Sequence, residues 1–386
     1  MFIKTVSIAL AASIMISCTG KSEETKKTNK ANMSDNEIFL LIGTYTSNGG
    51  SEGIYVHRFN TETGESDSLS MAEAINPSYL AINSDEEYVY AVGENSDEMA
   101  GVYSFSFDKE TGILHPINFQ STQSPGPCYV TIDQNGRNVH TANYGGGSIS
   151  SFQVNSDGSL TTVQSVLAFE GSGPDSTRQQ RSHVHSVMYS PDEDYLFAAD
   201  LGSDKLYRLS IINSPFAGQP TIVDRSLKEF DTPPGTGPRH FDFHPNGGSY
   251  LYLLGELSGE VLVYDYDDGG LELKQRVLAD SVSARGSADI HVSPNGQYLY
   301  ASNRLEADGI AIFSIDSEDG TLTKVGYQPT ARHPRNFVIS PNGKYLLVAG
   351  RDDNKIQVFE IDAETGLLTN TNQDILISKP VCLKFV

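Results

Sequence analysis

A segment of about fifty residues recurs along almost the whole chain, and this repeat constrains the fold more than any other feature. Each copy reads as an alternating strand, an Asn-Gly or Asp-rich turn, an apolar strand and then two further strands. One matched position in each copy serves as its anchor. The anchors are Pro77, Pro127, Val184, Pro238, Ser287, Pro334 and Pro380, and successive anchors are 50, 57, 54, 49, 47 and 46 residues apart. Four short strands in a unit of this length are typical of a propeller blade.

The two ends of the chain complement each other. After Pro380 only one strand remains, whereas "IFLLIGTY" at 38–45 matches the second strand of the repeat and "GIYVHRFN" at 53–60 matches the third. We therefore predict an all-β fold over residues 37–386, a seven-bladed β-propeller with four-stranded blades. The N- and C-terminal strands would close the last blade and leave no free sheet edge. A β-sandwich or a pair of β domains would not require complementary ends.

The first 36 residues lie outside the repeat. Lys4 precedes an apolar run from Val6 to Ile16, which is too short to cross a bilayer and typical of a signal peptide. The following "MISC" resembles a bacterial lipobox, so residues 1–18 are predicted to be a lipoprotein signal peptide with a lipidated Cys18. Residues 19–36 are polar and predict a disordered tether. This predicts a bacterial envelope protein held by its lipid, facing the periplasm or the outer-membrane surface. An ordinary cleaved secretory peptide with a coincidental cysteine is the alternative.

The chain is strongly acidic, with 27 Lys and Arg against 49 Asp and Glu and a formal net charge of −22. This balance argues against nucleic acid or an anionic membrane surface as a broad partner. A local arginine cluster can nevertheless bind a small anion.

The repeat also predicts where polar side chains meet. The first two strands of a blade run antiparallel, so the residue after the anchor and the residue ending the second strand share one mouth of the channel. The residues after the anchors, here called the first ring, are Ser78, Cys128, His185, Arg239, Ala288, Arg335 and Val381. The residues at the second-strand ends, the second ring, are Thr44, Glu94, Tyr144, Leu201, Glu256, Arg304 and Arg351. Blades 3 to 6 thus place a histidine, up to four arginines and a carboxylate at one opening.

The stretches "HVHS", "GPRHFDFHPNG" and "GTYTSNGGSEGIYV" resemble the lactonase family of seven-bladed propellers, from about residue 38 to the C-terminus. That family includes a bacterial 6-phosphogluconolactonase and the fungal carboxymuconate lactonizing enzyme. The resemblance implies hydrolysis of a sugar lactone, either 6-phosphogluconolactone or a related free aldonolactone. It also implies catalytic positions at His185, Arg239, Glu256 and Arg304. The acidic "RLEADG" loop beside Arg304 departs from the family pattern and could alter the substrate.

Opening a lactone requires a base that deprotonates water and donors that stabilise the oxyanion. Either Glu256 or His185 can be the base, and Arg239 and Arg304 can be the donors. Arg335 and Arg351 could hold a phosphate or carboxylate. Further substrate-binding candidates are His183, Glu94 and Tyr144. A non-catalytic ligand-binding lipoprotein and a carboxymuconate-type cycloisomerase remain as alternatives.

Three other patterns favour structural explanations. His183 and His185 share a strand face, but no third metal ligand is evident, because His240 has the opposite strand parity to Arg239. We therefore predict no metal and no organic cofactor. "YGGGS" at 144–148 lacks a following helix and the lysine of a phosphate-binding loop, and is predicted to be a turn. Cys128 and Cys382 are expected to be buried thiols rather than a disulfide.

Overall fold

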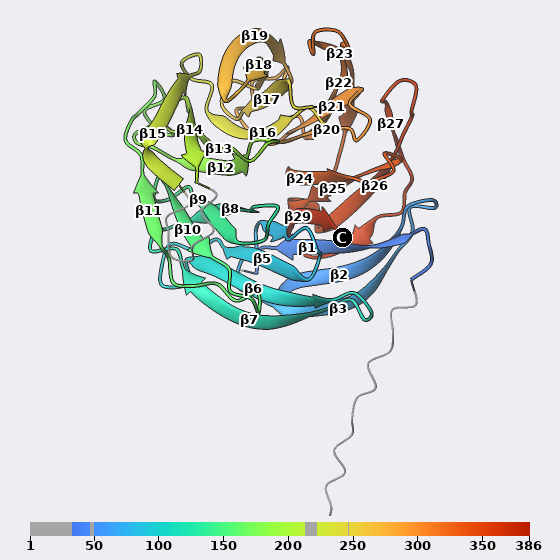
Figure 1. Cartoon of the computed structure of the whole chain (residues 1–386). Helices are drawn as coiled ribbons and strands as arrows, with labels where there is room; N and C mark the ends of the chain where they lie inside the picture. Colours follow the sequence, from blue (N-terminus) through green and yellow to red (C-terminus); the bar gives the residue numbers. More distant parts are fainter. Residues whose placement is uncertain (1–32, 47–49, 213–221, 246) are drawn as a thin grey trace, which may run out of the picture.

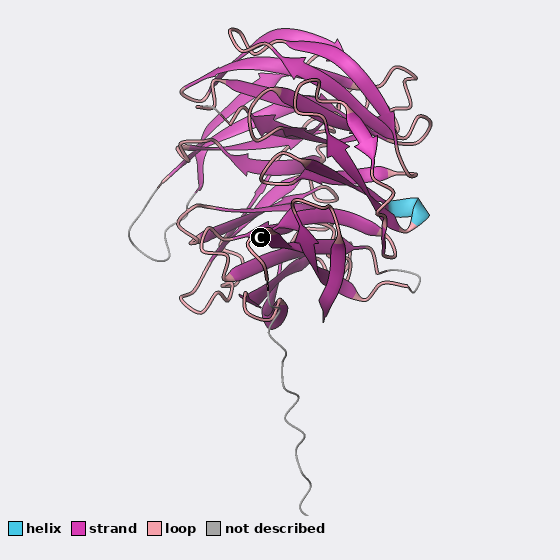
Figure 2. Cartoon of the chain, turned by 90° about the vertical axis from the view of Figure 1, so that its right-hand side faces the viewer, coloured by secondary structure: helices cyan, strands magenta, loops and turns pink. Residues whose placement is uncertain are grey.

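Seven β-sheets are arranged around a central axis in the computed structural model, which describes residues 33–46, 50–212, 222–245 and 247–386 (Figure 1). Strands account for nearly all the regular structure drawn in Figure 2. The described ranges contain one helical element, the 3-10 turn η1 (Arg351–Asp353), and no helix in them is long and apolar enough to cross a membrane. The predicted signal peptide and Cys18 lie outside the described residues. Of the predicted tether, residues 33–36 are described, and the Glu37 amide donates to the Ser34 carbonyl there.

Five blades follow the chain in order and have four antiparallel strands each. Blade 1 contains β4 (Leu80–Ile82), β5 (Tyr88–Gly93), β6 (Gly101–Asp108) and β7 (Ile113–Ser121). Blade 2 contains β8 (Pro127–Ile132), β9 (Asn138–Asn143), β10 (Ser148–Gln153) and β11 (Ser165–Ala168). Blade 3 contains β12 (Val184–Tyr189), β13 (Tyr195–Asp200), β14 (Lys205–Ile211) and β15 (Ile222–Asp231). Blade 4 contains β16 (Pro238–Phe243), β17 (Tyr250–Gly255), β18 (Glu260–Asp267) and β19 (Gly270–Leu278). Blade 5 contains β20 (Ser287–Val292), β21 (Tyr298–Asn303), β22 (Gly309–Ile315) and β23 (Leu322–Pro329).

Blade 6 differs from the predicted four strands because its outer edge is divided. It contains β24 (Pro334–Ile339), β25 (Tyr345–Gly350), β26 (Lys355–Ile361), β27 (Leu368–Asn370) and β28 (Ile375–Leu376). Both β27 and β28 pair with β26, one at each end of it. The turn between these two short strands interrupts what is one continuous strand in the other blades.

The closure predicted from the two chain ends is confirmed. Blade 7 has the order β29 (Pro380–Phe385), β1 (Glu37–Thr44), β2 (Gly53–Asn60), β3 (Ser66–Glu73). Its innermost strand therefore comes from the C-terminus and its outer three from the N-terminal part, with Leu40 opposite Phe385 and Ile42 opposite Leu383. The innermost strands contact one another around the complete circuit from β4 through β24 to β29. The ring of blades is therefore closed, with no terminal blade that could detach from its neighbours.

Apolar side chains of neighbouring blades form the core between the sheets. Tyr300 and Ile312 of blade 5, for example, pack with Phe337, Leu346 and Phe359 of blade 6, all nearly inaccessible to solvent. Burial of each such side chain contributes about 1.5–3 kcal/mol.

A tyrosine and a glycine tie three pairs of neighbouring blades together in the same way. The Tyr252 hydroxyl of blade 4 donates to the carbonyl of Gly320 in blade 5 at 3.0 Å. Gly320 has a φ of 71°, and a Cβ there would lie 2.5 Å from the Tyr250 ring. Any other residue would be strained by the backbone conformation and would collide with that ring. The same contact recurs between Tyr90 and Gly158 and between Tyr300 and Gly366.

A β-bulge near the start of the innermost strand recurs in six of the seven blades. In blade 4, Pro238 pairs with Gly255 and His240 pairs with Leu254, so Arg239 is left without a partner on β17. The side chain of a bulge residue does not follow the regular alternation of side-chain directions along the strand. The skipped residues include Cys128, His185, Arg239, Ala288, Arg335 and Val381. These are the first-ring positions of all six bulged blades.

Candidate functional site

The first ring converges on one small cavity in the channel. Six of its seven members line this cavity together with Tyr79, His240 and Asn336; the six are Ser78, Cys128, His185, Arg239, Arg335 and Val381. The seventh, Ala288, provides its carbonyl oxygen to the Arg239 guanidinium. The centre of a water molecule can occupy a volume of about 10 Å³ in this cavity.

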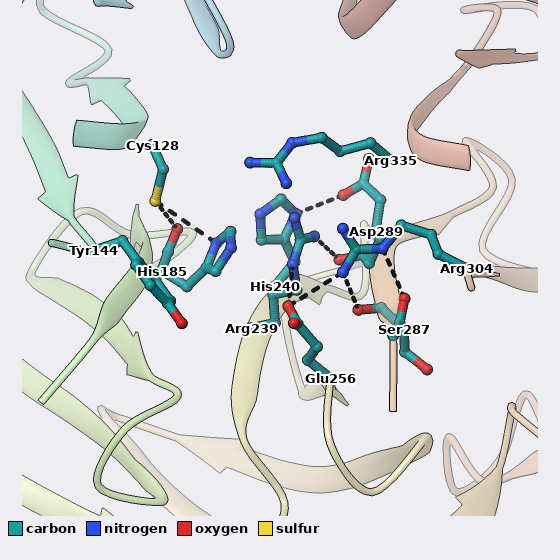
Figure 3. Close-up of polar contacts among 12 residues, drawn as sticks. Cys128, Tyr144, His185, Arg239, His240, Glu256, Ser287, Asp289, Arg304 and Arg335 are labelled. Atoms are coloured by element: carbon teal, nitrogen blue, oxygen red, sulfur yellow. Dashed lines mark hydrogen bonds and ion pairs between the residues drawn. The ribbon is translucent and has the colours of Figure 1, made fainter. Parts of the chain in front are cut away.

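Glu256 follows β17 directly and contacts three guanidinium groups, of which those of Arg239 and Arg304 are drawn beside it in Figure 3. Its Oε2 lies 2.8 Å from Nε of Arg239 and 3.3 Å from Nη2 of Arg304, and its Oε1 accepts a hydrogen bond from Nη2 of Arg178 at 2.7 Å. The Arg239 Nε–H is not aligned with the oxygen, so that contact is an ion pair without a hydrogen bond. Burial opposes ionisation of Glu256, but the three arginines outweigh it and lower its pKa to about 2. Glu256 is therefore a carboxylate at neutral pH and a very weak base.

Arg178 was not found from the sequence. It lies in the segment between β11 and β12, outside both predicted rings, and reaches over the mouth to Glu256. Asp175 in the same segment pairs with Arg285, which precedes β20 of blade 5. The sequence did contain a signal for this segment. The longest spacing between successive anchors, 57 residues, separates Pro127 from Val184, and the extra length lies in this segment.

Arg239 and Arg304 are the buried cations of the site. Arg239 is 1% exposed, and burial lowers its pKa. Burial also lowers the pKa of Arg304, to about 9, which still leaves it charged at neutral pH. Arg304 follows β21 and donates from Nε to the Gly286 carbonyl at 2.7 Å. Both guanidinium groups are thus fixed by backbone carbonyls as well as by Glu256, so their remaining donors point in set directions.

Arg335 forms a second ion pair at the mouth. Its Nη2 lies 3.3 Å from Oε2 of Glu94, which also accepts a hydrogen bond from the Tyr45 hydroxyl at 2.8 Å. The guanidinium also lies over the Tyr45 ring. Four arginines, Arg178, Arg239, Arg304 and Arg335, therefore face the two carboxylates at the mouth, and even with the buried Asp289 near Arg239 the arginines outnumber the carboxylates. The mouth is locally cationic in an acidic protein.

His185 is buried on β12 with Nδ1 3.8 Å from the Cys128 sulfur. Its ring makes edge contacts with Tyr144 and His240. Burial, together with the positive charge of Arg239, holds the pKa of His185 well below its usual range. The imidazole is therefore neutral at neutral pH.

The expectation from strand parity that His240 would point away from Arg239 is wrong. The bulge at Arg239 lets two consecutive side chains, Arg239 and His240, line the same cavity. His240 Nδ1 lies 2.7 Å from Oδ1 of the buried Asp289. Figure 3 draws both side chains. Strand alternation alone cannot reveal a bulge, which is why the pattern missed this residue.

Aromatic rings pack beside the cavity. Tyr79 lines it and stacks on Tyr129 with ring centroids 3.9 Å apart, and both meet the His240 ring edge to face. Both tyrosines also line a separate hollow of about 320 Å³, together with residues that include Leu80, Ile132 and Lys384. Tyr79 therefore borders both spaces.

The remaining predicted residues lie around the opening. His183 stacks on Tyr144 with centroids 4.5 Å apart, and its Nδ1 is 2.9 Å from the Tyr144 carbonyl oxygen. Arg351 begins η1 and pairs with Asp352, so it does not join the Glu256 cluster. It is linked to that cluster through His333, which contacts both Arg351 and Arg304.

The predicted turn and thiols are also in place. "YGGGS" forms the turn between β9 and β10. Cys128 and Cys382 are buried and free. In the part of the chain that the structure describes, no group of three or more His, Cys, Asp or Glu side chains is arranged to hold a metal ion.

Comparison with known proteins gives a consistent result. A family profile described as lactonase, 7-bladed beta-propeller, matches residues 39–385. A 6-phosphogluconolactonase of Formosa agariphila is 37% identical over 88% of this chain and 97% of its own. A solved candidate 6-phosphogluconolactonase of Bacteroides fragilis is 52% identical, with a TM-score of 0.88 over 91% of this chain and 98% of its own. The periplasmic gluconolactonase of Pseudomonas aeruginosa is 34% identical, with a TM-score of 0.84 over 91% and 99%.

Proposed function

Because the chain belongs to the seven-bladed β-propeller lactonase family, we propose that it hydrolyses the lactone of a sugar acid at the mouth formed by blades 3 to 6. The observation that carries this proposal is the buried cluster in which Glu256 holds Arg239 and Arg304 side by side. Fixed cationic donors in a water-poor site stabilise the oxyanion of acyl transfer better than mobile ones.

Within this proposal Glu256 orients the arginines and does not act as the base. A carboxylate with a pKa of about 2 holds a proton too weakly to take one from water efficiently. Its three ion pairs also engage both carboxylate oxygens. A neutral imidazole fits the requirement better. His185, predicted from the sequence, is a neutral imidazole at this mouth.

The unbalanced positive charge favours an anionic substrate or product. Hydrolysis of any sugar lactone creates a carboxylate, and Arg335 or Arg178 is placed to attract it. A 6-phosphate on the substrate would add a second anionic group, with Arg351 as a further cation at the rim. The relatives include both a 6-phosphogluconolactonase and a periplasmic gluconolactonase. We favour a free aldonolactone, in keeping with the predicted export signal.

An envelope location belongs to the same proposal. The P. aeruginosa relative is described as periplasmic, which supports a location outside the cytoplasm. Lipid attachment at Cys18 rests on the sequence alone.

The deciding experiment measures acid release by the purified full-length protein from glucono-, galactono- and 6-phosphogluconolactone. We expect hydrolysis above the spontaneous rate for at least one of them. Arg239→Lys should lose most of it, because an ammonium cannot reproduce the guanidinium fork. Arg276→Lys is the matched control, since Arg276 forms an exposed pair with Glu260 on the outside of the same blade. Binding of lactones without hydrolysis would instead establish a ligand-binding protein, and isomerisation without net hydrolysis a cycloisomerase.

A further inference from the structure

Besides Nε of Arg239, which is ion-paired with Glu256, two buried polar atoms at the central cavity have no hydrogen-bond partner among the described residues. They are Nε2 of His240 and Oγ of Ser78, in side chains belonging to residues that are 5% and 2% exposed. Both residues line the cavity that the first ring encloses. An unpaired buried polar group costs about 1–3 kcal/mol, so two of them at one cavity point to a ligand that pairs with both.

The size of the cavity identifies the ligand. Its open volume of about 10 Å³ is close to the ~10–15 Å³ that one buried water requires. Such a water needs two to four polar partners. His240 and Ser78 supply two, and Arg335 and His185 also line the cavity. The space is too small for a sugar ring.

The contact with Asp289 sets the tautomer of His240. The His240 Nδ1 and Asp289 Oδ1 are 2.7 Å apart, and Asp289 also accepts hydrogen bonds from the Asn336 side chain and from His291. A carboxylate can only accept at this contact, so Nδ1 carries the proton and Nε2 presents a lone pair to the cavity. This arrangement of carboxylate, imidazole and reacting hydroxyl is the one by which hydrolases activate a nucleophile.

We propose that this cavity holds the nucleophilic water of the lactonase reaction and that His240, positioned by Asp289, is the base that deprotonates it. This inference rests on the proposed function and assigns the base to His240 instead of His185. One water proton moves to Nε2 while the water oxygen bonds to the lactone carbonyl carbon, and the carbonyl π electrons move to oxygen beside Arg239. The oxyanion then re-forms the carbonyl as the ring C–O bond breaks, and the ring oxygen takes the proton back from Nε2. The product is the open hydroxy acid.

Burial lowers the pKa of His240 to about 4, and Asp289 opposes that effect. The imidazole is thus unprotonated at neutral pH, and the Asp289 carboxylate stabilises the imidazolium that forms when Nε2 takes the proton. Tyr79 and Tyr129 both contact the His240 ring edge to face, so packing as well as Asp289 fixes the orientation of the imidazole.

The test compares His240→Asn with His244→Asn in the full-length protein. An asparagine at 240 can still donate to Asp289 but has no basic nitrogen facing the cavity. Loss of a general base lowers kcat by about a hundredfold or more, with KM changed little. His244 follows the same strand, with Nε2 3.0 Å from the Gly296 carbonyl oxygen, and does not line the cavity. His244→Asn should keep kcat within about threefold of the parent, far from the loss expected for a general base.

Three further measurements keep the proposal falsifiable if His240→Asn does not fold. Ser78→Ala removes one partner of the water and should lower kcat about tenfold, a loss equivalent to about 1.4 kcal/mol. Asp289→Asn should lower kcat with KM changed little, because a positioning residue acts on the chemical step. Nitrogen-15 spectra of the parent should show His240 protonated at Nδ1 only.

The outcomes separate the two proposals. An active parent in which His240→Asn or Ser78→Ala retains full kcat overturns the assignment of His240 and leaves the lactonase function standing. A His240 that is protonated at Nε2 also overturns it. A parent that hydrolyses no lactone in the panel overturns the proposed function, and the catalytic assignment of His240 with it.

Discussion

Arg239 and Glu256 stand at opposite ends of the β16–β17 hairpin, yet the Arg239 Nε lies 2.8 Å from the Glu256 Oε2. The two strands of the hairpin run antiparallel, so the start of β16 and the end of β17 lie together at the mouth, where Pro238 pairs with Gly255. The bulge at Arg239 then turns the guanidinium toward the carboxylate. The ion pair is therefore a product of strand pairing. Arg304 is added from blade 5, and Arg178 from the segment between blades 2 and 3.

Replacing Glu256 by glutamine should lower kcat/KM about a hundredfold, because Arg239 and Arg304 lose the charge that holds them together. The loss should be nearly independent of pH between 5 and 8, since Glu256 stays ionised throughout that range. Steady-state kinetics over this range check it. Glu260→Gln, which breaks an exposed pair with Arg276 on the same blade, is the control and should leave the rate unchanged. A glutamine variant with parental kinetics would remove Glu256 from the mechanism.

Arg178→Ala should raise KM about tenfold with a smaller effect on kcat, an effect equivalent to about 1.4 kcal/mol of substrate binding. Arg178 is the most exposed of the three arginines around Glu256, with 37% of its side chain accessible. Arg181→Ala is the matched control from the same segment, because its guanidinium donates to the Gly145 carbonyl instead. Equal kinetics for the two variants would show that Arg178 does not contact the substrate.

Acid should destabilise the parent more than Glu256→Gln below pH 4.5. The pKa of Glu256 is about 2 in the folded protein against an ordinary value of 4.5. A lowered carboxyl pKa stabilises the fold fully above 4.5, and this contribution, on the order of 3 kcal/mol, is lost as the pH falls through 2. Thermal melts from pH 6 to 2.5 check it. The buried histidines weaken both proteins below pH 6.5, so only the difference below 4.5 reports on Glu256. Parallel melting curves in that range would contradict the lowered pKa.

Deleting residues 379–386 should abolish cooperative folding. These residues include β29, whose loss strips blade 7 of its innermost strand and exposes Leu40 and Ile42 beside it. Circular dichroism and calorimetry would measure the transition. Lys384→Ser, which alters a partly exposed side chain in the same strand, should melt close to the parent. A truncated chain that melts like the parent would contradict the closure of the ring by β29.

Cys18→Ala should release the protein from the membrane fraction with its thermal transition unchanged. Lipidation requires the cysteine, and no repeat of the propeller includes it. Fractionation and metabolic labelling with a fatty acid check this expectation. A variant that stays in the membrane fraction would show that another anchor exists.

The repeat alone determined the number of blades, the shared seventh blade and both rings of residues at the mouth. These features depend on spacing and on strand alternation, which are local properties that a single sequence displays. The six first-ring residues that line one cavity were found in this way, including Arg239 and Arg335.

Only the tertiary structure decided which of these residues interact. Arg178 reaches Glu256 from a segment outside the repeat, and its contact depends on how that segment crosses the mouth. His240 lines the cavity because a bulge breaks the alternation that parity arguments assume. The ionisation of Glu256 likewise depends on three arginines brought from separate parts of the chain, since the electrostatic energy depends on distance in space. Spacing along the chain places side chains at an opening, but charges act over ångströms, and only the closed ring sets those distances.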